Sequence, residues 1–391
     1  MKTVLVYVNS QFGIGHFQRC FCILRSLEER HPDVNTLLVF GGLPHADFDE
    51  LSKTTKVRLP GLTFHQSEDK IGYVPRPVDA RHTLQEVLCE RRDLISAAIK
   101  NVHVQVVLLE YFPFSKQSLA TEVEHLLAEM KAPNPPTVVS SIRDFMTIDA
   151  GFDRAFAEDF ISKRCSHVFV HADPRFATLQ DTYGDVSAFE RRIRYTGYVA
   201  DPRLAQAALP AQTRTIVVSV GGGKDGGPLF DIFVQALRLT NPRVLHGCEI
   251  LVFPGLFLPA ESTRVLRESV ADLKHLYNIR LCEFSEYRTA VSSSSLSVSM
   301  CGYNTAMELI AIRVPNICFV PRQRTEQLVR AKMLNRLGLA EVAESAQHLS
   351  AVFSRLGEPS IQRRSTFGQI DLHGAARSAD LLGALARGQD V

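Results

Sequence analysis

The chain has 391 residues, more than one domain of ordinary size, so its length predicts two large domains. Hydrophobic residues make up 45% of the chain and charged residues 22%, which excludes a wholly disordered protein. With 44 Lys and Arg against 42 Asp and Glu, the net charge of +2 excludes a protein whose main task is to grip nucleic acid by its phosphates.

The cysteines and the apolar runs indicate a cytoplasmic protein. The eight cysteines are scattered without CxxC pairs, which argues against a zinc ribbon or a disulfide framework. Residues 1–8 form too short an apolar run for a signal peptide, and the longest apolar candidate, residues 309–320, contains Arg313, Pro315 and Asn316. We therefore expect reduced cysteines, no transmembrane segment and a cytoplasmic location.

Short apolar runs rich in β-branched residues alternate with longer amphipathic stretches along the whole chain, as is typical of βα units with parallel sheets. The predicted strands of the first half are residues 4–8, 36–40, 56–59, 104–109, 137–140 and 167–171. Those of the second half are residues 215–220, 249–252, 278–281, 296–299 and 316–319. Between the first two strands, apolar residues recur at helical spacing from Phe17 to Leu27, with Arg19 and Arg25 on other faces of the helix.

A polar stretch with alanine and proline, residues 201–214, separates the two series and has the composition of an interdomain connection. We therefore predict two doubly wound α/β domains, residues 1–200 and 213–370, with residues 371–391 forming a C-terminal helix that returns to the first domain. Ligands of open parallel sheets bind beyond the carboxyl ends of the strands, so the loops after strands are the places to look for chemistry.

Gly13-Ile14-Gly15-His16 follows the first predicted strand. Glycines permit a tight turn and close approach of a ligand, and the start of a helix offers free N–H groups to an anion. A histidine here can act as a general base because its ordinary pKa lies near neutrality. The same residues also fit a plain strand-to-helix turn, so both interpretations stay open.

Five of the eight residues from Val220 to Gly227 are glycine, and a helix is expected directly afterwards. This richness indicates a phosphate-binding loop formed around Gly221, Gly222 and Gly223, although it is neither a Walker A loop nor a GxGxxG fingerprint. Lys224 can pair with a phosphate or be solvated, and a flexible turn remains the alternative.

The most informative stretch is residues 282–339. After the strand at 296–299, Gly302, Asn304 and Thr305 lead into a helix that carries Glu308, which suits a diphosphate next to a diol. Glu326 and Gln327 follow the next strand at another helix entrance, where carboxylate and amide groups can hydrogen-bond several hydroxyls.

This stretch resembles the carboxyl-terminal donor-binding domain of MurG-type GT-B glycosyltransferases of family 28. The whole chain is similar to the glycosyltransferases related to them, through residues 12–16, residues 195–199 and the loop that begins at Gly221. The similarity is strongest over residues 284–338 and weak over residues 41–103. The resemblance implies the GT-B fold, in which two Rossmann-like domains face each other across a cleft.

The resemblance also implies a role for each matched residue. Phe284 would lie against the nucleotide base, and Glu308 would bind the ribose hydroxyls. Gly302, Asn304 and Thr305 would line the diphosphate together with the Gly221-Gly222-Gly223 loop, and Glu326 and Gln327 would hold the sugar. Gly15 and Lys224, from the two glycine-containing loops, are further candidate ligand contacts. Taken singly, Phe284 also fits a core residue, Glu308 a solvated helix residue and Gln327 a helix cap.

The base has three candidates. Glu110 and Asp144 each follow a predicted strand, and either can be the base or orient His16. His171, at the end of another strand, receives no role from the sequence. Asp47-Phe48-Asp49 matches the metal-binding DxD pattern of other glycosyltransferases, but its polar setting favours a helix surface, and the chain has no HxH or HExxH spacing.

These features predict an inverting, metal-independent glycosyltransferase that moves a hexosyl or N-acetylhexosaminyl group from a UDP-sugar to a small soluble acceptor. The preference for UDP, and for UDP-GlcNAc in particular, comes from the resemblance alone. The UDP-sugar is a co-substrate, so no cofactor and no metal are expected, and neither nucleic acid nor a polyprenyl lipid is expected as a partner.

Two alternative functions would use the same predicted donor pocket. One is a UDP-sugar 2-epimerase, which needs no acceptor, and the other is a non-catalytic protein that binds a nucleotide-sugar. A dehydrogenase is disfavoured because neither half has GxGxxG followed by an acidic residue at the required distance. The sequence leaves the oligomeric state open.

Overall fold

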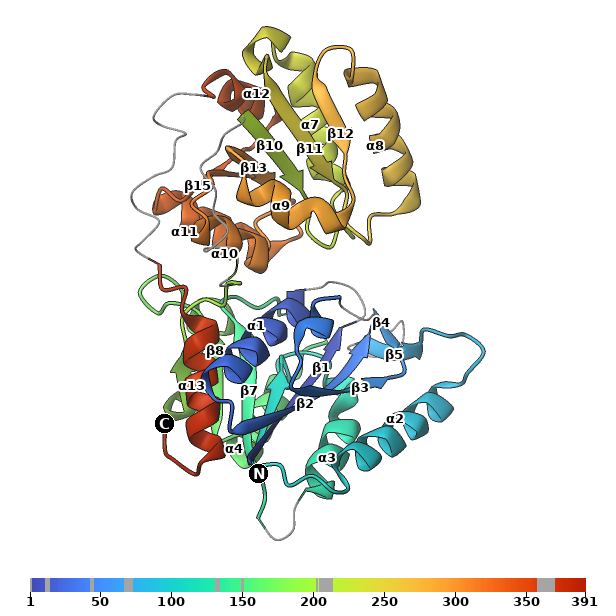
Figure 1. The fold of residues 1–391 in the computed structure, drawn as a ribbon, viewed down its shortest axis with the longest axis vertical. Coiled ribbons are helices and arrows are strands. Elements are labelled where there is room, and N and C mark those ends of the chain that lie inside the picture. Colours follow the sequence, from blue (N-terminus) through green and yellow to red (C-terminus); the bar gives the residue numbers. More distant parts are fainter. Residues whose placement is uncertain are drawn as a thin grey trace. The chain divides into compact units, whose positions relative to one another are not determined.

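The chain forms two compact α/β units. The computed structural model describes residues 2–10, 15–42, 46–66, 73–130, 134–148, 151–201, 203, 214–356 and 370–391. Unit 1 comprises Met1–Val199 and Asp371–Val391, and unit 2 comprises Ala200–Ile370. Each unit has a parallel sheet with helices packed on it (Figure 1). The predicted fold class, two doubly wound α/β domains, is confirmed.

Unit 1 is built on a seven-stranded parallel sheet with the order β3-β2-β1-β6-β7-β8-β9. Its strands are β1 (Lys2–Ser10), β2 (Val34–Gly42), β3 (Thr54–Leu59), β6 (Val106–Glu110), β7 (Thr137–Arg143), β8 (His167–His171) and β9 (Ile193–Tyr195), and β4 (Leu62–Gln66) and β5 (Tyr73–Pro77) form an antiparallel pair. Its helices are α1 (Gly15–Arg30), α2 (Leu84–Ile99), α3 (Ala120–Glu129), α4 (Arg154–Arg164), α5 (Gln180–Tyr183) and α13 (Gly374–Ala386), with short 3₁₀ turns at Ala46–Glu50, Gln117–Leu119 and Glu190–Arg192.

The C-terminal helix α13 packs against α1 within unit 1. Gly383 allows the close approach, because a Cβ atom there would lie 2.9 Å from the His31 ring. Arg30 pairs with Asp380 at 2.7 Å, and Arg387 pairs with Asp33 at 2.5 Å. The end of the chain is therefore tied to the helix that follows the first strand.

Unit 2 is built on a six-stranded parallel sheet with the order β12-β11-β10-β13-β14-β15. Its strands are β10 (Arg214–Ser219), β11 (Cys248–Phe253), β12 (Asn278–Leu281), β13 (Leu296–Ser299), β14 (Asn316–Cys318) and β15 (Ala340–Val342). Its helices are α7 (Gly227–Leu239), α8 (Ala260–Leu273), α9 (Tyr287–Ser292), α10 (Tyr303–Ala311), α11 (Thr325–Arg336) and α12 (Ala346–Ser354), with 3₁₀ turns at Pro242–Leu245 and Phe284–Glu286.

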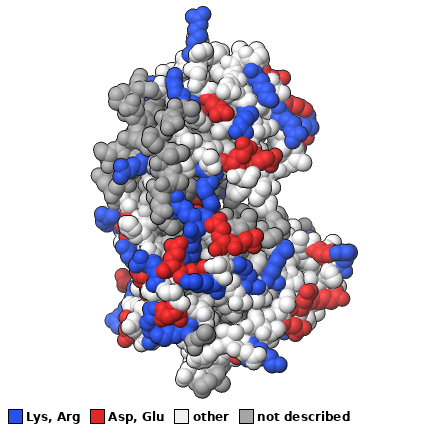
Figure 2. All heavy atoms as spheres, viewed as in Figure 1, with Lys and Arg blue, Asp and Glu red and all other residues white. Residues whose placement is uncertain are grey.

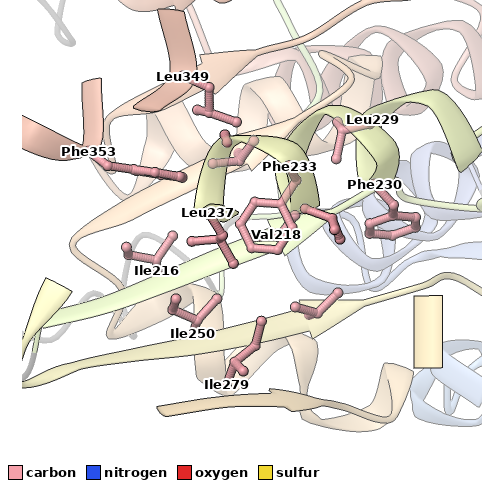
Figure 3. Close-up of a cluster of buried hydrophobic side chains, with 14 of the residues drawn as sticks. Ile216, Val218, Leu229, Phe230, Phe233, Leu237, Ile250, Ile279, Leu349 and Phe353 are labelled. Carbon is pink, nitrogen blue, oxygen red and sulfur yellow. The ribbon is translucent and has the colours of Figure 1, made fainter. Parts of the chain in front are cut away.

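Side chains alternate between the two faces of the sheet along the strands of unit 2, and apolar side chains pack on both faces. Ile216 and Val218 of β10 point into a core with Phe233 of α7 and Phe353 of α12 (Figure 3). Val217, between the two β10 residues, belongs to a separate cluster on the other face. Because both faces are covered, the central strands β10 and β11 contain continuous apolar runs, which is why they could be recognised in the sequence.

Charges of both signs are mixed over the face of the protein drawn in Figure 2, with no extended surface of one sign. Among the described residues, no helix is long and apolar enough to cross a membrane.

Candidate functional site

In unit 1, the strand order reverses between β1 and β6, which lie side by side at the centre of the sheet. After β1 the chain continues outward through β2 and β3, whereas after β6 it continues through β7 and β8. Loops diverge at such a point and leave a crevice at the carboxyl ends of the strands, where open α/β sheets bind ligands. His16 follows β1 and Glu110 ends β6, so both candidates lie at this point.

The structure brings His16 and Glu110 into contact. Nδ1 of His16 lies 2.9 Å from Oε1 of Glu110, and the same carboxylate oxygen accepts a hydrogen bond from the Arg19 guanidinium. The second oxygen accepts a 2.7 Å bond from the Ser141 hydroxyl. Since all these donors point at one buried carboxylate, Glu110 is placed to orient the imidazole rather than to accept a substrate proton.

The pKa values give the protonation states of the pair. Burial opposes ionisation of Glu110, but the Arg19 charge and the hydrogen bond from His16 hold its pKa well below the usual range. Burial lowers the pKa of His16 to about 3, despite the opposing hydrogen bond from Glu110. At neutral pH the pair is therefore a carboxylate with a neutral imidazole, whose Nδ1–H points at Glu110 and whose Nε2 can accept a proton.

The loop after β6 places Tyr111 against His16. Tyr111 and Lys116 have positive φ angles of 62° and 56°, which non-glycine residues seldom adopt. The Tyr111 ring meets the His16 ring edge-on with centroids 5.0 Å apart, and the Arg143 guanidinium lies 5.3 Å from the Tyr111 centroid. Unfavourable backbone geometry of this kind concentrates at functional sites, because the surrounding structure must enforce it.

Asp144, the third candidate base, is fully buried directly after β7, and its Oδ1 accepts a 2.8 Å hydrogen bond from the Phe145 amide. His16, by contrast, keeps 22% of its side chain exposed. This difference favours His16 as the residue that a substrate can reach.

Sequence reasoning missed Arg19 and Ser141. The helical pattern places Arg19 on a face away from the apolar residues, but in the structure that face lies against Glu110, and Arg19 is only 2% exposed. The sequence signal for Arg19 was its position one helical turn after His16, because residues at this spacing lie on the same side of a helix. For Ser141, the signal was a polar residue within the buried strand β7.

In unit 2, the equivalent reversal of strand order lies between β10 and β13. The loop after β10 requires its glycines. Gly221 and Gly223 have positive φ angles of 61° and 94°, and a Cβ atom on Gly223 would lie 2.6 Å from the Pro254 carbonyl oxygen. Phe257 donates a 2.8 Å backbone hydrogen bond to Gly222, so the loop is fastened to the loop after β11.

Gly302 is different, because nothing in its own backbone requires glycine. Its φ of −58° suits any residue, and a Cβ atom there would meet no atom within 4 Å. Gly302 is the N-cap of α10, and the first N–H groups of a helix have no partner within the helix itself. Open space in front of a helix N-terminus is the arrangement that an anion needs.

Arg330 stabilises the turn before α10. This arginine is fully buried in α11, donates a 2.9 Å hydrogen bond to the Cys301 carbonyl and lies 5.6 Å from the Tyr303 ring centroid. Cys301 has a positive φ of 60°, so its carbonyl is fixed in a conformation that cysteine rarely adopts. Sequence reasoning assigned no role to Arg330.

Phe284, Thr305 and Glu308 gather around Tyr287. The Phe284 and Tyr287 rings are parallel with centroids 6.2 Å apart. Burial, and then the nearby Glu308 carboxylate, raise the pKa of Tyr287, whose hydroxyl also lies near Thr305. Phe284 and Glu308 are both half-buried, so each presents part of its side chain to the surface.

Glu326 and Gln327 open α11. Glu326 is 5% exposed and lies 3.6 Å from Arg330. Within the part of the chain that the structure describes, the buried Oε1 atom of Gln327 accepts no hydrogen bond. A buried acceptor of this kind usually has a partner, so a hydroxyl donor from a ligand would complete it. Asn304 is half-buried at the start of α10.

The remaining candidates are placed as follows. Gly15 begins α1, and Lys224 is exposed in the glycine loop, whereas Gly13 and Ile14 lie outside the described residues. Phe48 of the DxD pattern is buried between Phe17 and Phe40, and Asp49 is exposed. The side chain of Asp47 lies outside the described part. Among the described residues, no cluster of three or more His, Cys, Asp or Glu side chains could hold a metal ion.

Solved structures that are similar to this chain include glycosyltransferases and UDP-GlcNAc 2-epimerases. A glycosyltransferase from Rickettsia africae ESF-5 has a TM-score of 0.61 at 14% identity, covering 100% of this chain and 99% of that chain. MurG from Acinetobacter baumannii has a TM-score of 0.56 at 14% identity, covering 98% and 99%. UDP-GlcNAc 2-epimerase from Neisseria meningitidis, bound to UDP-GlcNAc, has a TM-score of 0.61 at 11% identity, covering 99% and 100%.

The chain has the GT-B fold. The predicted resemblance is thereby confirmed for the fold, since identities of this size establish nothing finer. No protein-family model matches the chain, and comparison with curated protein sequences finds no significant match. Unit 1 and unit 2 are the two Rossmann-like domains of this GT-B protein.

Replacing Gly302 of the GT-B protein with alanine should leave the fold intact and weaken the binding of nucleotide. The added methyl group meets no protein atom but occupies the space in front of the α10 N-terminus. We expect UDP affinity, measured by calorimetry, to fall by tenfold or more, a loss of about 1.4 kcal/mol.

Gly223→Ala is the matched control for this substitution. Its methyl group would collide with the Pro254 carbonyl oxygen, so it should lower the thermal unfolding midpoint, which Gly302→Ala should not. Unchanged UDP affinity in Gly302→Ala would remove Gly302 from the site.

Lowering the pH should destabilise the GT-B protein already at pH values well above those at which its carboxylates titrate. Burial holds the pKa values of His16 and His171 at about 3 in the folded chain, whereas unfolding returns them to about 6.5. Between these values the unfolded chain binds more protons, so stability falls as the pH falls through the window. From pH 7.5 to pH 5 we expect a loss on the order of 2 kcal/mol per histidine in urea unfolding. Equal stability at both pH values would show that these rings are not held neutral.

Proposed function

We propose that this protein is an inverting, metal-independent glycosyltransferase that transfers a hexosyl or N-acetylhexosaminyl group from a UDP-sugar, UDP-GlcNAc being favoured, to a small-molecule acceptor. Unit 1 would carry the base and bind the acceptor, and unit 2 would bind the donor. The observation that carries the proposal is the His16–Glu110 pair at the strand-order reversal of unit 1, combined with a glycine-lined helix N-terminus at the same place in unit 2.

His16 would act as the general base. Its Nδ1–H is held by Glu110, which leaves Nε2 to take the proton from an acceptor hydroxyl. The acceptor oxygen would form a bond with the anomeric carbon while the bond between that carbon and the diphosphate oxygen breaks. The proton ends on Nε2, and UDP leaves with the electron pair of the broken bond. A single displacement of this kind inverts the anomeric configuration.

The charge that develops on the departing UDP would be met by the α10 N-terminus at Gly302 and by the glycine loop before α7. Preorganised N–H groups stabilise such a charge without reorganising during the reaction. In this proposal Phe284 lies against the base, Glu308 binds the ribose, Asn304 and Thr305 line the diphosphate, and Glu326 and Gln327 hold the sugar. The unsatisfied Gln327 Oε1 atom supports the last assignment, because a sugar hydroxyl would supply its missing donor.

A UDP-sugar 2-epimerase is the second candidate. The Neisseria epimerase matches this chain as well as the glycosyltransferase from Rickettsia does, with TM-scores of 0.61 for both. An epimerase would need the donor site in unit 2 and a titratable residue in reach of the sugar, but no acceptor.

Incubating the protein with UDP-GlcNAc and no acceptor separates the two candidates. A transferase should leave the sugar unchanged apart from slow release of UDP, and mixtures of small hydroxylated acceptors should then accelerate UDP release. Appearance of a second UDP-N-acetylhexosamine in the NMR spectrum, with no acceptor present, would identify an epimerase instead. Tight binding with neither reaction would leave a nucleotide-sugar-binding protein.

A further inference from the structure

A chain of buried polar side chains continues from Glu110 into the core of unit 1. The Ser141 hydroxyl donates to Oε2 of Glu110 at 2.7 Å, and Ser141 Oγ lies 2.9 Å from Nε2 of His171. Nδ1 of His171 lies 2.8 Å from the Thr196 hydroxyl. Ser141 belongs to β7, His171 ends β8, and Thr196 follows β9, so the chain crosses three neighbouring strands at the carboxyl ends of β8 and β9. All three residues are fully buried.

Counting hydrogens gives a direction to the two bonds that join Glu110, Ser141 and His171. Glu110 is ionised and its oxygens only accept, so the single hydroxyl hydrogen of Ser141 must point at Glu110. Ser141 Oγ must then accept its other bond from an Nε2–H group of His171. Burial lowers the pKa of His171 to about 3, so the ring is neutral and Nδ1 carries no hydrogen. Nδ1 of the neutral ring therefore accepts from the Thr196 hydroxyl, for which the Gly197 carbonyl oxygen, 3.1 Å from the hydroxyl oxygen, is a second acceptor.

We propose that Ser141 and His171 are positioning residues for the His16–Glu110 pair, and that the directed chain Thr196–His171–Ser141–Glu110 fixes the carboxylate that orients His16. The role in turnover rests on the proposed function of His16 as a base. The chain itself is a property of unit 1 that can be measured without a substrate. Neither Ser141 nor His171 needs to touch the substrate in this role.

The chain of hydrogen bonds holds the Glu110 carboxylate in one orientation. Arg19 and His16 both bind Oε1, and the Ser141 hydroxyl holds Oε2, so the carboxylate is fixed at both oxygens and Ser141 adds to its resistance to turning about its terminal bond. Hydrogen bonds in a buried chain also polarise one another, which strengthens the one at its end. Rotation of the carboxylate would move Oε1 away from Nδ1 of His16 and release the imidazole.

Substitutions along the chain should lower turnover without changing donor affinity. Ser141→Ala takes a hydrogen bond from a buried carboxylate, and we expect a loss of about tenfold to a hundredfold in turnover. His171→Leu should reduce turnover less, because Ser141 keeps its hydroxyl. His171→Gln should restore turnover, since its amide N–H can donate to Ser141 from the position of Nε2.

Ser140→Ala is the matched control. Ser140 is the preceding residue of β7, is equally buried and donates a 2.7 Å hydrogen bond to the Phe112 carbonyl. The substitution therefore also removes one buried hydrogen bond but leaves the chain intact, and turnover should stay within about twofold of the original. Measuring the unfolding free energy of both variants separates loss of stability from loss of positioning.

The deciding measurement is nitrogen-15 NMR of the histidine rings in the substrate-free protein at about pH 7. We expect His171 as the neutral Nε2–H tautomer and His16 as the neutral Nδ1–H tautomer, with His16 becoming a tautomer mixture in Ser141→Ala but not in Ser140→Ala. An Nδ1–H or protonated His171, or an unchanged His16 in Ser141→Ala, would overturn the proposal. If the NMR result is as expected but no UDP-sugar is turned over, the proposed function fails and the positioning chain stands.

Discussion

His16→Ala should lower the turnover of the UDP-sugar by about a hundredfold to ten-thousandfold, the usual contribution of a general base. Donor affinity should be unchanged, because the donor contacts that we propose lie in unit 2 and His16 lies in unit 1. Initial rates give the first quantity and calorimetric titration gives the second. A lower rate at constant affinity is the signature of a group that acts in the transition state.

His82→Ala is the control for this variant. His82 is another histidine of unit 1, but it is 53% exposed and its nearest charged partner is Asp79 at 4.0 Å. It should turn over UDP-sugar at the original rate. If His16→Ala is as active as His82→Ala, the base is another residue, and the arrangement around Glu110 has a purely structural purpose.

Arg19→Met should reduce the free energy of unfolding by about 3–5 kcal/mol, because it leaves the fully buried Glu110 carboxylate without its charged partner. Methionine has a similar length and fills the same space, so the loss reports the charge rather than a cavity. Urea unfolding followed by circular dichroism measures it.

Arg25→Met, on the same helix, gives the comparison. Arg25 pairs with Glu29 and Glu50, both at 2.9 Å, but these partners are exposed to solvent, so we expect a loss below about 1 kcal/mol. Combining Arg19→Met with Glu110→Gln should recover part of the loss, since the stranded charge is then removed. Equal losses for Arg19→Met and Arg25→Met would show that Glu110 is not charged in the folded protein.

The central strands β10 and β11 could be predicted from the sequence because each contains a continuous run of buried apolar residues. The predictions for residues 278–281 and 296–299, where apolar and polar residues alternate, coincide with β12 and β13. The hairpin of β4 and β5 was missed, because it lies outside the main sheets and contains prolines and exposed polar residues such as His65. β9 and β15 were missed because each has only three residues, most of them only partly buried, whereas the equally short β14 is fully buried and continues into apolar residues.

The site could be predicted where a short stretch of sequence carries the whole arrangement. Gly302 and Glu308 lie within two turns of one helix, so their relation follows from local geometry. The His16–Glu110 contact joins residues 94 positions apart, and the sequence could suggest it only through the position of both after strands. Arg19 and Ser141 complete that contact through burial, which a charge on a helix and a serine in a strand do not reveal.

Titrating the purified protein with UDP-GlcNAc in a calorimeter, without added metal, tests the central claim most directly. The account predicts selective binding of UDP and UDP-sugars over GDP-sugars, dTDP-sugars and NAD, and weaker binding by Gly302→Ala and Glu308→Ala with unchanged folding. Binding of NAD alone, or of no nucleotide at all, would contradict the assignment of a donor site to the α10 N-terminus and the glycine loop of unit 2.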